Sequence, residues 1–71
     1  MKKLMFDAGK LRELIRINGK TYVAQAKEAG LSRSSFLGIA SGQMTPKLET
    51  ISLLADYYGV EPLALIWEDE R

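Results

Sequence analysis

Residues 21–41 read Thr-Tyr-Val-Ala-Gln-Ala-Lys-Glu-Ala-Gly-Leu-Ser-Arg-Ser-Ser-Phe-Leu-Gly-Ile-Ala-Ser, and this stretch decides the fold. Thr21 is a good helix N-cap, and Gly30 suits the left-handed residue that ends a helix. Ser32 is a second N-cap, and the helix that follows it is expected to run to about Ser41. Two helices joined by a short turn that contains glycine form a helix-turn-helix unit.

The apolar positions of the stretch fit two helices that cross closely. Ala26 is expected at the crossing, where a small side chain lets the two backbones approach. Leu31 is expected to fill the turn, and Phe36 with Ile39 to anchor the second helix. The complete expected inner face is small or apolar: Val23, Ala26, Ala29, Leu31, Phe36 and Ile39.

Similar signals on either side predict three further helices. One is expected to begin after the N-cap Asp7 and to end at Gly19. A second is expected to open at Thr45-Pro46, and a third at Glu61-Pro62, because proline is tolerated in the first helical turn. We expect no strand. The predicted fold is all-α, a single compact five-helix domain over residues 1–71, with residues 68–71 as a solvated, frayed tail.

Composition excludes several classes of function. The 71 residues include neither cysteine nor histidine, so disulfides, thiolate metal sites and histidine chemistry are absent. Acidic residues cluster at Glu68-Asp69-Glu70, on the expected tail and away from any pocket. We therefore expect no enzyme, metal or cofactor, and no small-molecule effector. Without a long apolar run or an export signal, we expect no membrane association and a cytoplasmic location.

Charge is distributed unevenly along the chain, although the net charge is only +1. Residues 1–35 hold eight basic and three acidic residues, a net charge of +5, whereas residues 36–71 hold two basic and six acidic residues, a net charge of −4. Such an asymmetry is typical of a surface that meets a polyanion, although uneven solvated helix faces would also produce it.

Several short segments recur in the order and spacing of a known family. They are Leu11-Arg12-Glu13-Leu14, Gly30-Leu31-Ser32-Arg33-Ser34, Ser41-Gly42-Gln43, Thr45-Pro46-Lys47-Leu48-Glu49-Thr50-Ile51, Leu54-Ala55 and Tyr58-Gly59-Val60. Together they resemble the Cro/repressor family of helix-turn-helix domains, the lambda-repressor-like fold. The resemblance implies five helices, with the third in the major groove of double-stranded DNA, and a homodimer on a two-fold operator.

The resemblance also implies which residues contact DNA. Ser32, Arg33 and Ser34 match the start of the recognition helix, followed by Leu37 and Gly38 on its next outward turn. Arg33 is the strongest candidate for base readout, because arginine can donate two hydrogen bonds to guanine. The alternatives for Arg33 are a phosphate contact or a solvated side chain. The full expected DNA-binding set is Lys20, Thr21, Tyr22, Ser32, Arg33, Ser34, Ser35, Leu37, Gly38, Gln43 and Lys47.

Three positions depart from the family pattern. Leu37 and Gly38 replace polar or basic residues, and Gln25 occupies a normally apolar position, where it needs a hydrogen-bond partner if buried. These departures leave an alternative open, a protein-interaction module of the same fold with weak or lost DNA binding, similar to an antitoxin that binds a protein partner. A dimer interface is expected at Leu63, Ile66 and Trp67, although the core is the favoured place for Leu63 and Ile66, and Trp67 is expected to serve both the core and the interface.

Overall fold

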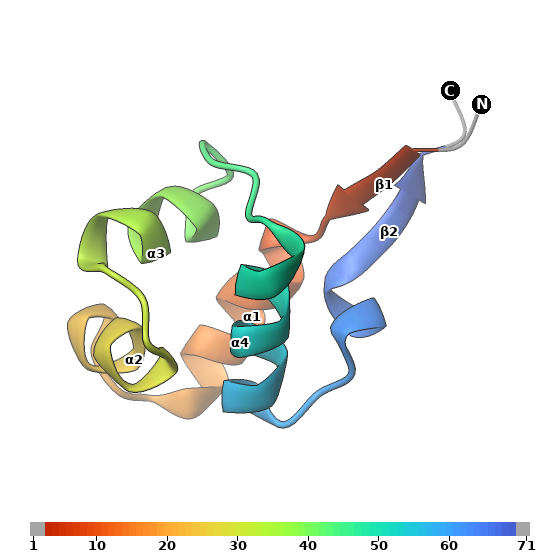
Figure 1. Cartoon of the computed structure of the whole chain (residues 1–71). Coiled ribbons are helices and arrows are strands. Elements are labelled where there is room, and N and C mark those ends of the chain that lie inside the picture. The colour runs from red at the N-terminus through yellow and green to blue at the C-terminus, as the bar shows by residue number, and fades with distance from the viewer. Residues whose placement is uncertain (1–2, 70–71) are drawn as a thin grey trace.

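Residues 3–69 of this computed structural model form four α-helices, a short 3-10 helix and a two-stranded antiparallel sheet (Figure 1). The helices enclose one core, and the two strands project from it as a ribbon (Figure 1). In chain order the elements are β1 (Lys3–Phe6), α1 (Ala8–Asn18), α2 (Tyr22–Ala29), α3 (Arg33–Ala40), α4 (Leu48–Tyr58), η1 (Pro62–Leu65) and β2 (Ile66–Asp69).

The first three helices begin and end at the capping residues that the sequence predicts. The side chains of Asp7, Thr21 and Ser32 each accept a hydrogen bond from the backbone N–H three residues further on, at 2.9–3.2 Å. Gly30 ends α2 with φ at 85°, a conformation that glycine adopts at little steric cost. Leu31 N–H then donates to the carbonyl of Ala26 at 2.8 Å, so the turn between α2 and α3 closes back onto α2.

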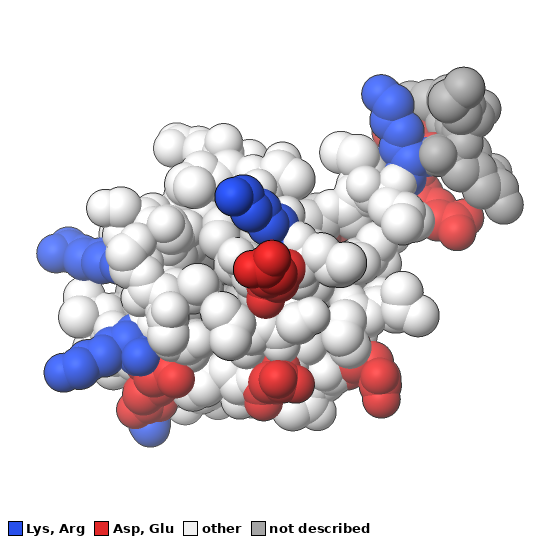
Figure 2. All heavy atoms as spheres, viewed as in Figure 1, with Lys and Arg blue, Asp and Glu red and all other residues white. Residues whose placement is uncertain are grey.

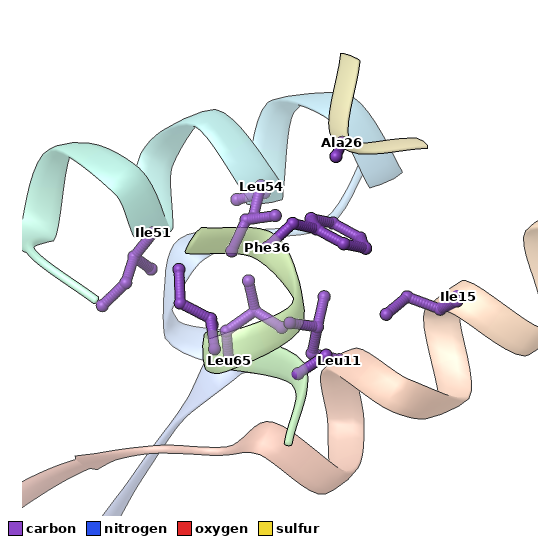
Figure 3. Close-up of a cluster of buried hydrophobic side chains, with 10 residues drawn as sticks. Leu11, Ile15, Ala26, Phe36, Ile51, Leu54 and Leu65 are labelled. Atoms are coloured by element: carbon purple, nitrogen blue, oxygen red, sulfur yellow. The ribbon is translucent and has the colours of Figure 1, made fainter. Parts of the chain in front are cut away.

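Phe36 lies at the centre of the core and is fully buried (Figure 3). Side chains from α1 and α4 surround it, including Leu11 and Leu54, which are also fully buried. Ala26 is 2% exposed at the crossing of α2 and α3, as predicted from its small size. The core therefore holds α3 by one side only, through Phe36 and Ile39.

The predicted five-helix, all-α fold is wrong at both ends of the chain. In place of a fifth helix, residues 62–65 form a single 3-10 turn, and Ile66 adopts the extended backbone of a strand (φ −129°, ψ 141°). β2 pairs with β1 in an antiparallel register that sets Phe6 opposite Ile66 and Met5 opposite Trp67. Four residues are too few for either strand to show a clear alternating pattern, and their partners lie at the opposite end of the sequence.

The burial of the last segment also differs from the prediction. Leu63 is 77% exposed and is not a core residue, whereas Leu65 is fully buried and Ile66 is half-buried against the core. Trp67 is 47% exposed on the ribbon. The predicted tail over residues 68–71 is wrong for Glu68 and Asp69, which belong to β2, and its remainder lies outside the described residues.

Two other local predictions are wrong. α4 begins at Leu48 with Lys47 as its N-cap, and not at Thr45-Pro46, because the first helical hydrogen bond runs from Ile51 N–H to the carbonyl of Lys47. Val23, expected on the inner face of α2, is 51% exposed. Residues 43 and 44, in the loop before α4, are bonded to α3 and not to α4, since their N–H groups both donate to the carbonyl of Gly38.

Candidate nucleic-acid interface

The first turn of α3 is exposed to solvent. Arg33 and Ser34 are exposed, and within residues 3–69 neither side chain has a hydrogen-bond or ion-pair partner. Ser32 and Ser35 are occupied with each other: Ser32 Oγ caps the N–H of Ser35 and donates to Ser35 Oγ at 2.9 Å. Of the four residues predicted here, two are therefore free to contact a ligand, and the other two stabilise the helix start.

Packing on the second turn of α3 explains why residue 38 is a glycine. A Cβ atom at this position would lie 2.5 Å from Sδ and 2.8 Å from Cγ of Met44, because the Met44 side chain crosses the helix there. Gly38 is half-buried for this reason, and it offers no side chain to read DNA. Leu37 beside it is 38% exposed and remains available for an apolar contact. At Gly38, therefore, only backbone atoms are left to make the predicted contact with DNA.

Basic side chains collect beside the first turn of α2. A shallow hollow of about 330 Å³ is lined by Arg12, Arg16, Lys20 and Tyr22, among others. Tyr22 is 40% exposed, and its ring packs edge-on against Phe36 at a centroid distance of 5.9 Å. The Tyr22 ring is therefore anchored on α3 while part of it reaches solvent.

Arg16 is a candidate that the sequence-based prediction missed. It lines the hollow, is exposed, and forms no hydrogen bond or ion pair in the described part of the chain. Arg12 is less free, because its Nη1 donates to the carbonyl of Ala40 at 2.8 Å and so fastens α1 to the end of α3. The four-residue spacing of the two arginines, which places them on one helix face, was a usable signal.

Lys20 is already paired inside the protein. Its Nζ lies 2.9 and 3.0 Å from the two carboxylate oxygens of Glu28, and Tyr57 also donates to that carboxylate. The Tyr57 hydrogen bond and the contacts with Lys20 lower the pKa of the Glu28 carboxyl, and the Glu28 hydrogen bond raises the pKa of Lys20. The positive charge of Lys20 is thus largely offset before any ligand arrives.

The other predicted contacts lie on the loop between α3 and α4. Gln43 and Lys47 are both exposed, and Lys47 serves as the N-cap residue of α4 without a side-chain capping bond. Thr21 is the N-cap of α2, and its hydroxyl oxygen accepts from Ala24 N–H at 3.1 Å. The predicted residues thus lie at the starts of α2, α3 and α4, on the second turn of α3 and on the loop between α3 and α4.

Gln25 has the partners that its burial requires. It is fully buried, and its Nε2 donates to the carbonyls of Ile15 and Lys20 at 3.2 and 2.8 Å. Tyr58 OH donates to Gln25 Oε1 at 2.5 Å, and burial raises the pKa of the Tyr58 hydroxyl. The amide therefore joins α1, the following turn, α2 and α4, and so fixes where α2 starts.

Figure 2 shows basic and acidic side chains over much of the face in view. Several Lys and Arg side chains project at the end of the molecule formed by α2 and α3, with acidic side chains beside them, and both signs also lie over the middle of this face and on the ribbon. Among the described residues no cluster of acidic side chains is arranged to hold a metal ion, and no helix there is long and apolar enough to cross a membrane.

Comparisons of the chain with protein-family models, with curated proteins and with solved structures found no match. The resemblance to the Cro/repressor family thus remains a prediction from the sequence.

Proposed function

We propose that this protein is a non-enzymatic transcriptional regulator that binds double-stranded DNA as a homodimer, with the first turn of α3 in the major groove. The observation that carries the proposal is the state of Arg33: exposed, unpaired within residues 3–69, and placed at the start of a helix whose opposite side is anchored by Phe36. A guanidinium held in this way can donate two hydrogen bonds to a guanine edge. A cytoplasmic location, where the protein would meet its operator, is part of the proposal.

Contacts to phosphates are assigned to the hollow beside α2. Arg16 supplies an unpaired charge there, and Tyr22 supplies a hydroxyl beside the exposed start of the helix. Backbone N–H groups at a helix start attract phosphate, and such contacts set the position of a protein on DNA without reading its sequence. Lys20 contributes less than expected from the sequence, because Glu28 already balances its charge.

The test is selection of bound duplexes from a random library, followed by titration of the selected site at two salt concentrations. Affinity should fall by about 0.9 log unit per log unit of salt for each phosphate neutralised. Arg33→Ala should relax the preference at one base position, a loss of about 1–3 kcal/mol in discrimination. Arg16→Ala should weaken all sequences equally and reduce the salt slope by about one. A salt-independent affinity, or no enriched sequence, would contradict the proposal.

A second candidate function is protein recognition by the same surface. Leu37 and Met44 are 38% and 46% exposed, and both lie along the outer side of α3. An apolar strip beside Arg33 suits a partner protein as well as a thymine methyl group. Arg33→Ala separates the two candidates, since unchanged DNA affinity together with lost binding of a protein partner would favour protein recognition.

A further inference from the structure

We propose that two copies of this chain associate through the free edge of β1, forming a four-stranded antiparallel sheet in which Met5 of one copy faces Met5 of the other. In residues 3–69 the sheet has two strands, so each strand keeps one unpaired edge. Two-stranded sheets are only marginally stable alone, and an unpaired edge is a template for another strand.

The hydrogen-bonding pattern shows which residues face the free edge of β1. Asp7 N–H donates to the carbonyl of Leu65 at 2.7 Å, which makes this pair a hydrogen-bonded one. Hydrogen-bonded pairs alternate along an antiparallel ladder, so Met5 also directs its N–H and C=O toward β2. Leu4 and Phe6 therefore direct theirs toward the free edge, where they can pair with a second strand.

Two-fold symmetry and charge together select one register. In an antiparallel pair of identical strands the axis passes through a residue that faces its own copy. An axis at Met5 sets Leu4 opposite Phe6 of the other copy, which allows four backbone hydrogen bonds. It also sets Lys3 opposite Asp7 of the other copy at both ends, and opposite charges across strands stabilise the pair.

The side chains on the ribbon fit this register. Met5 lies opposite Trp67 within one copy, so the dimer would form an unbroken row across the sheet, Trp67 and Met5 of one copy followed by Met5 and Trp67 of the other. Methionine sulfur makes favourable contacts with aromatic rings. Beside the free edge, a hollow of about 200 Å³ bounded by Phe6, Gly42 and Thr45 can receive Leu4 of the second copy.

The exposed apolar surface indicates how strong this dimer is. Leu4, Met5 and Trp67 are 69%, 40% and 47% exposed. At about 100 Å² for each of these three side chains, one copy would bury at most roughly 300 Å² of apolar surface, well below the ~800 Å² of a standard interface. The expected dimer is therefore weak and concentration-dependent. The dimer deepens the proposed function, because a two-fold operator needs two α3 helices related by a two-fold axis. Only the biological role of the dimer rests on that proposed function.

The test uses the absence of cysteine from the chain. Met5→Cys should form a disulfide-linked dimer under mild oxidation at least about tenfold faster than Leu4→Cys or Leu63→Cys, because only residue 5 meets its own copy within the Cα distance of a disulfide, about 4.4–6.8 Å. Leu4→Cys controls for register, and Leu63→Cys controls for exposure, since Leu63 is 77% exposed outside the ribbon. Circular dichroism of each variant confirms that it is folded.

Sedimentation equilibrium of the unmodified chain, without DNA, completes the test. Association should rise with concentration, and Lys3→Glu should weaken it severalfold, whereas Lys27→Glu, the same charge change on the exposed side of α2, should leave it unchanged. A chain that stays monomeric, or Met5→Cys that cross-links no faster than either control, overturns the proposal. Because no step uses DNA, a failure of the dimer is distinguishable from a failure of DNA binding.

Discussion

Replacing Tyr58 with phenylalanine tests the buried network that sets the start of α2. The hydroxyl of Tyr58 donates to Gln25 Oε1 at 2.5 Å, and Gln25 is fully buried. Its removal leaves the amide oxygen without a partner, and a buried unsatisfied acceptor costs about 1–3 kcal/mol of stability. In a domain of this size each kcal/mol lowers the Tm by about 4–8 °C. We therefore expect the Tm of Tyr58→Phe to fall by at least about 4 °C.

Tyr57→Phe is the matched control, because the neighbouring hydroxyl also donates one hydrogen bond. Its acceptor Glu28 is exposed, so water replaces the lost donor and the loss of stability should be much smaller than in Tyr58→Phe. Thermal and urea unfolding followed by circular dichroism measure both variants. Tyr58→Phe should also cost much less in a Gln25→Leu background, where the acceptor is already gone. Equal effects of the two tyrosine variants would refute the reasoning.

Three further predictions concern the same helices. Gly38→Ala should stabilise by about 1 kcal/mol in a Met44→Ala background but by less in the natural chain, where the methionine must move aside, as urea unfolding would reveal. Ser32→Ala should lose about 1 kcal/mol of stability with its capping bond, whereas Ser34→Ala should lose almost none, and the reverse order would contradict the capping role. Because burial raises the folded-state pKa of Tyr58 above its ordinary value of 10.0, its protonated form favours folding. The stability that this pKa difference contributes is fully present below pH 10 and should decline as the pH rises above 10. Unfolding measured at several pH values should therefore show a less steep loss of stability above pH 10 in Tyr58→Phe than in the natural chain.

The exposure of a candidate site residue was predictable from the sequence where a neighbouring capping residue fixes its place in a helix. Arg33 and Ser34 follow the cap Ser32, and their place at the start of a helix set their exposure. The ion pair of Lys20 and the side chain that covers Gly38 were not predictable, because each involves a residue that the fold brings close. Glu28 pairs with Lys20 across α2, and Met44 returns over Gly38 only after the chain has turned.

The sequence by itself determined the extents of α1, α2 and α3, because their caps act over three or four residues and need no distant partner. The last segment was decided by the tertiary structure. Residues 66–69 carry apolar and acidic side chains that suit a helix end as well as a strand, and pairing with β1 settles the choice. The ladder hydrogen bonds of a strand need a second strand, and here that strand lies about sixty residues earlier, so no local pattern could reveal it.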